Sequence, residues 1–291
     1  MGFGPDERAV VLHADDIGMC QASVSAWAEM LDAGIISSAS VMVPCPWFPK
    51  VAALCRQNPN VDMGVHLTLT SEWRPYRWGP ISTRDPACGL MDEDGYFFRE
   101  PQQLLQGVSI AAAVVEMRAQ IERALQKGID VTHVDSHMFS AIYPALLPRY
   151  IELAFEYELP CVTWKPAKPE FHFTQEEVTE ISAIVSAYEE RNLAPVDYAF
   201  AIHYEDPANA LAEIKRGIDS LKPGVTHYLI HPAKDTPELR EMCAHWRHRV
   251  ADYEAFRNPE ILQYLKDSGV HLVGYRALRE AQRRNLAAHE N

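Results

Sequence analysis

Short apolar runs with strand character alternate with helical segments along the whole chain, and this alternation limits the fold more than any other feature. Runs of apolar residues at helical spacing separate the expected strands. Alternation of this kind predicts an α/β fold with a parallel sheet covered by helices. The expected strands are Ala9–Asp15, Ser38–Val43, Asp62–Leu69, Thr132–His137, Cys161–Trp164, Val196–Ile202, Val225–His231 and Val270–Tyr275.

The helical spacing is clearest in six of the intervening segments. Eight strands favour a closed or nearly closed (β/α) barrel, although a doubly wound open sheet would give almost the same pattern. The chain has no GxGxxG and no GxxxxGK[ST] sequence, which removes the usual nucleotide-binding reasons for an open sheet. The expected helices are Ser23–Ala33, Ala111–Lys127, Pro144–Tyr157, Gln175–Arg191, Ala208–Leu221 and Pro237–Phe256.

One long segment interrupts the alternation. Residues 71–101 are rich in aromatic residues and show little periodicity. Loops this long inside a compact domain are often binding loops, but the segment could also be an insertion packed on its own aromatics. We expect Trp73, Arg74 and Trp78 to contact substrate, with anchoring of the loop as the alternative. No linker, repeat or low-complexity tract is visible, so residues 1–291 are expected to form a single domain.

The charge balance limits the partners of this protein. The formal net charge of the 291 residues is −13, which argues against nucleic acid or an anionic membrane surface as a partner. No apolar run reaches roughly 18 residues, and the N-terminal residues do not resemble a signal peptide. We therefore expect a cytoplasmic protein that acts on a small molecule, and a homodimer is compatible with the sequence.

Two adjacent carboxylates follow the first expected strand, in the sequence His13-Ala14-Asp15-Asp16-Ile17-Gly18. Successive side chains of a strand point to opposite sides, so both carboxylates can converge only if the chain turns there, and Gly18 permits a turn. Two like charges this close are unfavourable unless a cation or a proton lies between them. Taken alone, the pair could also be an acidic N-terminus of a helix.

Histidines stand at the ends of three other expected strands. His66 follows Gly64 on one face of the third strand, and His133, Asp135 and His137 share one face of the fourth. His231 ends the seventh strand. A single histidine in a strand is more often a hydrogen-bonded core residue than a ligand. However, the carboxyl ends of parallel strands meet at one edge, so these side chains and the aspartates are expected to gather there.

A carboxylate with two imidazoles is a ligand set that suits Zn²⁺ or another divalent metal and leaves positions open for water and substrate. His133 and Asp135 are expected to orient a ligand from behind. The alternative for these two residues is a purely structural hydrogen-bonding role inside the sheet.

Four segments in this order resemble the motifs of the YdjC-like (ChbG) carbohydrate deacetylases. They are His13–Gly18, Gly64–Leu69, Thr132–His137 and Ile230–Pro232, and the resemblance extends from about Val10 to Tyr275. The family resemblance implies an irregular (β/α) barrel and removal of acetyl groups from N-acetylated sugars such as chitooligosaccharides. It further implies Asp16, His66 and His137 as ligands of one divalent metal (zinc or magnesium), Asp15 as catalytic base and a protonated His231 assisting the oxyanion or the leaving group.

Two positions depart from the family pattern. Met138 and Phe139 stand where the family usually has further histidines, and Thr163-Trp164-Lys165 stands where it tends to have an arginine. These departures leave the identity of the sugar open. The alternatives are another metal-dependent barrel hydrolase, such as a phosphoesterase, and a non-catalytic barrel that binds carbohydrate or metal. A phosphoesterase would need basic residues on the loops at the strand ends and usually a second metal.

Overall fold

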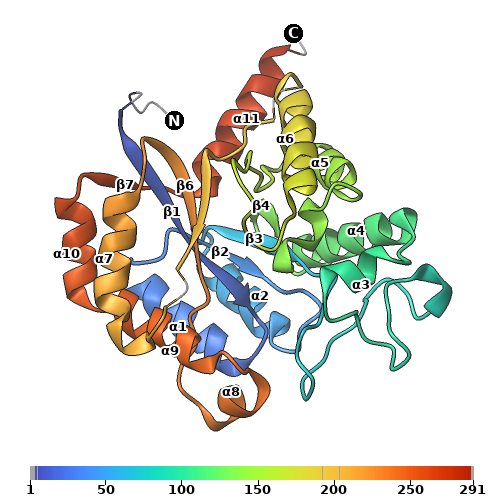
Figure 1. Ribbon diagram of the computed structural model, residues 1–291, viewed down its shortest axis with the longest axis horizontal. Helices are drawn as coiled ribbons and strands as arrows, with labels where there is room; N and C mark the ends of the chain where they lie inside the picture. Colours follow the sequence, from blue (N-terminus) through green and yellow to red (C-terminus); the bar gives the residue numbers. More distant parts are fainter. Residues whose placement is uncertain (1–3, 5, 192, 203, 290–291) are drawn as a thin grey trace.

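A curved parallel sheet forms the centre of the molecule, and helices pack around it (Figure 1). The computed structural model describes residue 4 and residues 6–191, 193–202 and 204–289. Within these residues the strands run in the order β4-β3-β2-β1-β6-β5, and β7 also pairs with β1. The strands are β1 (Arg8–Ile17), β2 (Ser38–Val41), β3 (Met63–Leu67), β4 (Val131–Ser136), β5 (Tyr198–Ala201), β6 (Gly224–Ile230) and β7 (Val270–Leu272).

The strand β1 is the centre of the sheet. It pairs with β6 from Arg8 to Ala14 along one edge, while β7 pairs with its first residues and β2 with its last. All of these pairings are parallel, and β1 is buried from its second residue to its last. A strand buried on both faces is expected to be apolar, which explains Ala9–Leu12 but not the polar residues that follow.

One expected strand is not part of the ladder. The segment Cys161–Trp164 forms only an isolated bridge to Val134, because the prolines at 160 and 166 on either side cannot donate ladder hydrogen bonds. The Val162 amide donates to Val134, and the Val196 amide, just before β5, donates to Thr163, each at 2.9 Å. The segment therefore spans the opening between β4 and β5, and the sheet is an irregular, nearly closed barrel.

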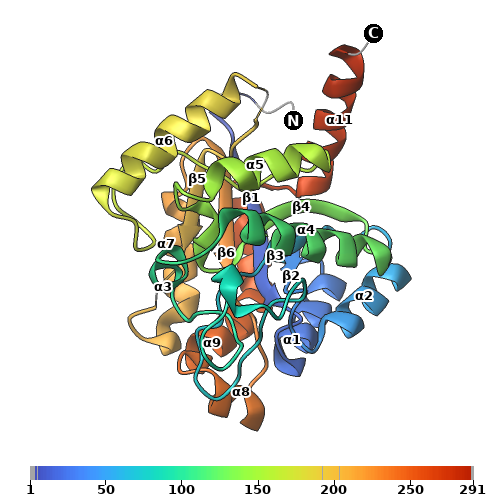
Figure 2. The same cartoon turned by 90° about the vertical axis from the view of Figure 1, so that its right-hand side faces the viewer.

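The helices cover the outside of the sheet, and the figure turned by 90° shows them around both of its flanks (Figure 2). The expected helix Pro237–Phe256 is two helices, because the chain is extended at Cys243. Four helices were not expected from the sequence, at Phe48–Gln57, Pro101–Leu105, Pro259–Asp267 and Tyr275–His289. The helices are α1 (Gln21–Asp32), α2 (Phe48–Gln57), α3 (Pro101–Leu105), α4 (Ile110–Gln126), α5 (Leu147–Glu156), α6 (Gln175–Glu189), α7 (Ala210–Ser220), α8 (Pro237–Met242), α9 (Trp246–Phe256), α10 (Pro259–Asp267) and α11 (Tyr275–His289).

The long segment 71–101 folds back on itself beside the carboxyl ends of the strands (Figures 1 and 2). It contains a short antiparallel bridge between Met91 and Phe97 and an ion pair of 2.8 Å between Arg77 and Asp92. Phe97 and Leu90 are fully buried, so the segment has a small core of its own. None of the helices in the described part of the chain is long and apolar enough to cross a membrane.

Candidate metal and catalytic site

The two aspartates that follow β1 point in different directions because the backbone changes conformation between them. Asp16 adopts a φ of 61°, and the register of β1 with β2 shifts between Ala14 and Ile17. Aspartate tolerates this left-handed conformation better than most residues. The sequence placed the turn at Gly18, whereas Asp16 itself already makes it. The irregularity lets both carboxylates reach the interior of the barrel.

Asp16, His66 and His137 form a compact buried cluster. Oδ1 of Asp16 lies 3.3 Å from Nε2 of His66 and 3.0 Å from Nδ1 of His137. The two ring nitrogens are 3.3 Å apart. Tetrahedral ligands with bonds of about 2.0–2.1 Å to zinc lie roughly 3.3 Å from one another, so these spacings fit a divalent metal. Oδ1 of Asp16 is buried without a hydrogen-bond partner, which also fits a cation at this point.

The charges around the cluster favour added positive charge. Burial opposes ionisation of Asp16, but Arg249 and His137 outweigh it and hold the pKa of this carboxyl well below its usual range. Burial lowers the pKa of His137, but the carboxylates of Glu72 and Asp16 raise it to about 9. In the same way, Asp135 and Asp15 overcome burial and raise the pKa of His66. The cluster therefore attracts a cation, which is either a proton or a metal ion.

Asp15 and His231 lie beside the cluster without belonging to it. Oδ2 of Asp15 is 3.8 Å from Nε2 of His231, and Oδ1 of Asp15 is 3.2 Å from Nε2 of His13. Burial raises the pKa of Asp15 above the usual carboxyl range, although His66 and His13 act against the rise. A carboxylate with increased proton affinity next to a metal position can act as a base.

His231 differs from the sequence-based expectation in its protonation. Its side chain is 37% exposed, toward the cavity, and its amide donates a 2.8 Å hydrogen bond to Asp252. Desolvation of the partly buried ring and the nearby Arg249 guanidinium lower the pKa of His231 below its usual range. These surroundings favour the neutral imidazole, whereas the sequence led us to expect a protonated one.

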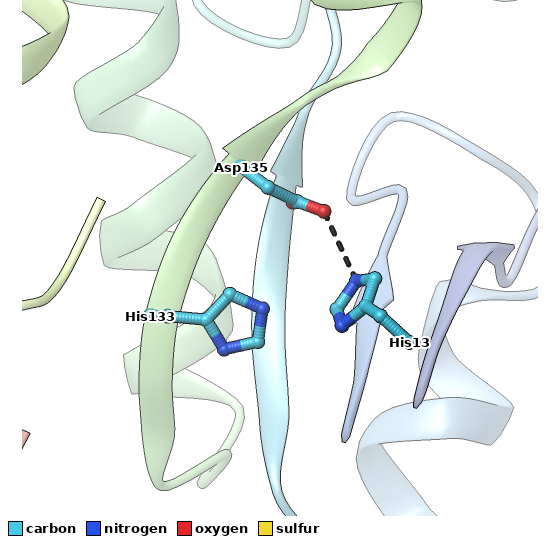
Figure 3. Close-up of side chains that lie close together, drawn as sticks. All are labelled: His13, His133 and Asp135. Atoms are coloured by element: carbon cyan, nitrogen blue, oxygen red, sulfur yellow. Dashed lines mark hydrogen bonds and ion pairs between the residues drawn. The ribbon is translucent and has the colours of Figure 1, made fainter. Parts of the chain in front are cut away.

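A buried polar network lies behind the cluster. Figure 3 shows His133 and Asp135 on β4 facing His13 on β1, with Oδ2 of Asp135 3.1 Å from Nε2 of His13. Oδ1 of Asp135 lies 3.0 Å from Nδ1 of His66, on the ring side away from the cluster. Asp135 is therefore placed to orient His66. His133 stacks on Tyr275, with 4.2 Å between ring centroids, and an orienting role of either residue stays a prediction.

Trp73, Arg74 and Trp78 do not line the cavity above the cluster. Arg74 is exposed, and the two tryptophans are almost fully buried. Nε1 of Trp78 donates to the Thr70 carbonyl at 2.8 Å, and the Arg249 guanidinium lies 5.2 Å above the Trp73 ring. The tryptophans thus pack behind the site and within the loop, and a role of these residues in substrate binding stays a prediction.

Two further residues at the site were not expected from the sequence. Glu72 places Oε2 3.0 Å from Nε2 of His137, and Arg249 on α9 donates to Oδ2 of Asp16 at 2.7 Å. Glu72 begins an irregular loop, and Arg249 is one of two arginines on α9, a helix without a clear apolar face, so neither stands in a recognisable motif. Only the fold brings them to the cluster.

A cavity of about 1050 Å³ opens above the cluster at the carboxyl ends of the strands. Asp15, Asp16, His66, His137 and His231 contribute to its wall, so the four strand ends named from the sequence do meet. Fold and site together define an α/β barrel protein whose cavity has a group suited to a divalent metal at its base.

Comparisons with known proteins agree with this class. A family model described as YdjC-like protein matches residues 9–267. The chain is 31% identical over 285 residues to a carbohydrate deacetylase from Thermus thermophilus, with 97% of each chain covered. A carbohydrate deacetylase from Thermoanaerobacter pseudethanolicus is 25% identical, with 94% of this chain and 100% of that relative covered. The chain therefore belongs to the YdjC-like family, as its motifs indicated.

A solved structure supports the fold. A protein from Enterococcus faecalis, described as a candidate for cellobiose-phosphate cleavage, superposes with a TM-score of 0.76. The alignment covers 94% of this chain and 99% of that one at 23% identity. At this level of identity the likeness establishes the shared fold alone.

Proposed function

We propose that this protein is a metal-dependent hydrolase that removes acetyl groups from an N-acetylated carbohydrate. The observation that carries the proposal is the buried group of Asp16, His66 and His137, with spacings of 3.0–3.3 Å, at the base of a large cavity. Asp15 and His231 beside it supply groups that metal binding alone does not require. The names of the two family relatives, both carbohydrate deacetylases, support the same reaction.

The three cluster residues would hold one divalent metal. Two imidazoles and a carboxylate suit zinc better than magnesium, which prefers oxygen ligands. Such an ion supplies Lewis acidity toward an amide carbonyl and toward a water molecule. Arg249 holds the second oxygen of Asp16 at 2.7 Å, which leaves only Oδ1 to face the ion.

Asp15 is the base of the proposed reaction. As the oxygen of water forms a bond to the acetyl carbon, one proton of the water passes to the Asp15 carboxylate. His13 and Asp135 belong to the buried network and do not line the cavity, and Nε2 of His13 lies 3.2 Å from Oδ1 of Asp15. Oδ2 of Asp15 faces His231 of the cavity wall.

His231 completes the reaction as a neutral imidazole. When the bond between the carbonyl carbon and nitrogen breaks, the departing nitrogen needs a proton, and the Asp15 carboxyl is the donor. His231 lies 3.8 Å from Oδ2 of Asp15 and can pass this proton on. Because a low pKa keeps the ring from holding an extra proton, the ring gives up one proton to the departing nitrogen as it takes one from Asp15, and the products are acetate and the amine of the sugar.

A phosphoester substrate fits this cavity poorly. Of the described residues that line it, Arg249 is the sole lysine or arginine, and it is engaged by Asp16. Lys165 and Lys234 pair with Glu189 and Glu29, outside the lining. The lining contains many carboxylates, which repel phosphate: Asp15, Asp16, Glu72, Glu100, Glu170 and Asp252.

The test combines metal analysis with product analysis. The purified protein, supplied with zinc or magnesium, should release acetate from N-acetylglucosamine or its β-linked disaccharide, and no phosphate from p-nitrophenyl phosphate. Asp16→Ala, His66→Ala and His137→Ala should each lose the metal and acetate release while keeping the circular dichroism of the wild type. Full metal occupancy in all three variants would overturn the site, and phosphate release would overturn the reaction.

The remaining expectations belong to the same proposal. We infer that residues 1–291 act as one domain in the cytoplasm on a small carbohydrate, without nucleic acid or membrane as partner. The net charge of −13 and the single sheet support this view. Light scattering at working concentration would decide between a monomer and a homodimer.

A further inference from the structure

One wall of the cavity is aromatic and has an unusual backbone. Phe139 and Phe171 line the cavity and are half-buried. The ring centroids of the two residues are 4.7 Å apart, with 50° between the ring planes. Phe139 follows the cluster residue His137 by two positions, so this wall, which we call the Phe139–Phe171 wall, adjoins the metal position.

Both phenylalanines lie in strained segments. Met138 and Phe139 have φ values of 50° and 52°, and Phe171 and His172 have values of 50° and 69°. Residues other than glycine rarely adopt this conformation, and they keep it only where the surroundings hold them there. All four residues line the cavity. Strain at four residues of one cavity wall indicates a functional constraint on the position of these rings.

Buried aromatic residues support the wall from behind. The Trp164 ring lies 5.3 Å from that of Phe139 and 5.7 Å from that of Phe171. Nε1 of Trp164 donates to Glu170 at 2.7 Å, which fixes the indole. Phe173 packs against Phe139 at 6.4 Å but is buried and does not line the cavity. The wall is therefore a preformed aromatic surface in a cavity whose lining also contains six carboxylates.

An uncharged sugar ring fits such a surface. Sugar rings carry a face of C–H groups that packs on aromatic rings, while their hydroxyl groups can reach the polar side of the cavity. Pockets for ligands of ordinary size have volumes of about 300–1,000 Å³, so the cavity has room for more than one ring.

We propose that the Phe139–Phe171 wall binds a second sugar ring of the substrate, next to the ring whose acetyl group is removed. The new assignment is the place of this second ring, against Phe139 and Phe171. This inference rests on the proposed deacetylase function. It assigns a role to Phe139, one of the positions at which this chain departs from the family pattern.

The kinetic test compares a monosaccharide with a disaccharide. Phe139→Ala and Phe171→Ala should raise KM for N,N′-diacetylchitobiose about tenfold more than KM for N-acetylglucosamine. The effect should lie in KM and not in kcat, and Phe139→Trp should restore the preference. Phe200→Ala is the matched control, because Phe200 also lines the cavity but comes from β5 and packs on Tyr228, outside the wall. Equal KM changes for both sugars, or the same length dependence in Phe200→Ala, would overturn the inference.

A binding measurement separates this inference from the proposed function. Isothermal titration calorimetry of the metal-loaded protein with chitobiose, the disaccharide that has no acetyl groups, requires no turnover. The wild type should bind it, and Phe139→Ala should bind about tenfold more weakly. If the protein released no acetate but Phe139→Ala still bound chitobiose more weakly than the wild type, the deacetylase function would be rejected. The wall would then remain a sugar site. Absent binding by the wild type would reject the wall.

Discussion

Oε2 of Glu72 lies 3.0 Å from Nε2 of His137, while Nδ1 of the same ring faces Asp16 at the same distance. Asp135 stands in the same relation to His66, 3.0 Å from the nitrogen that points away from Asp16. Both histidines of the cluster thus have a carboxylate behind them. Such partners fix the tautomer and orientation of a ligating imidazole and increase its basicity. One of the two carboxylates comes from the sheet and the other from the long loop.

Removing the charge of Glu72 should weaken metal binding. We expect Glu72→Gln to lower the metal affinity roughly tenfold, because the loss of such a carboxylate typically costs 10–100-fold. Competition with a fluorescent chelator measures this affinity. Glu100→Gln is the control, since Glu100 also lines the cavity but belongs to the N-terminus of α3. An affinity equal to that of the wild type in Glu72→Gln would show that the loop does not take part in the metal site.

Asp15 and His231 should affect the chemistry and not the metal. We expect Asp15→Asn and His231→Ala each to lower kcat by roughly 10²–10⁴, the usual contribution of a general acid or base. Metal content should stay near that of the wild type, because neither side chain belongs to the compact cluster. Elemental analysis and acetate release measure the two effects separately.

The low pKa of His231 also changes the expected pH profile. A protonated His231, as expected from the sequence, would lose its proton near neutrality, and the rate would fall above that pH. Because burial and Arg249 keep the imidazole neutral, no such decline should come from His231. His231→Ala should therefore keep the profile shape of the wild type between about pH 7 and 9. In the elemental analysis described above, loss of the metal in Asp15→Asn would contradict the assignment, because it would mean that the roles of Asp15 and Asp16 had been exchanged.

Periodicity predicted the sheet because parallel strands are short, apolar and separated by helices. Seven of the eight expected strands are present. The remaining one, Cys161–Trp164, runs beside β4 as an irregular segment with prolines on either side. The interior face of the barrel was visible as polar residues at alternate positions of β4. Periodicity does not predict which distant elements come into contact. For example, α9 brings Arg249 to Asp16, more than 230 residues away in the sequence.

The candidate site was predictable where one strand end supplies one side chain. Asp16, His66 and His137 stand at such ends, and their convergence follows from parallel pairing. Phe171 and Glu72 come from irregular segments, where the position of a side chain depends on packing and not on a repeat. The neutral state of His231 depends on burial and on Arg249, neither of which a sequence pattern contains.

Gly64 should be required for packing behind the site. A Cβ atom at this position would lie 2.4 Å from Cε1 and Nε2 of His133, a ring that is fully buried and stacked on Tyr275. Because the ring cannot move away, we expect Gly64→Ala to lower the free energy of unfolding by about 1–3 kcal/mol. Urea denaturation measures the change. In Gly107→Ala the new Cβ meets no atom within 4 Å, so its stability should stay near that of the wild type. A Gly64→Ala protein as stable as that control would mean that the His133 ring is not held as tightly as its contacts indicate.

Asp130 should stabilise the fold in a pH-dependent way through the C-terminal helix. It lies just before β4 and forms ion pairs with Arg276 and Arg279 of α11. The hydrogen bond from Arg279, followed by that from Arg276, lowers the pKa of Asp130 to about 2.

A depressed carboxyl pKa adds stability above the pKa of the unfolded chain, about 3.9, and this stability is lost as the pH falls toward 2. Since 51% of the Asp130 side chain is exposed, solvent screening limits the contribution to about 1 kcal/mol. Asp130→Asn should therefore be less stable than the wild type at pH 7, and the difference should shrink between about pH 4 and pH 2. Denaturation by urea across this range measures it, with Asp267→Asn, at an exposed position at the end of α10, as the control. A stability difference that stays constant down to pH 2 would show that Asp130 acts through packing and not through its charge.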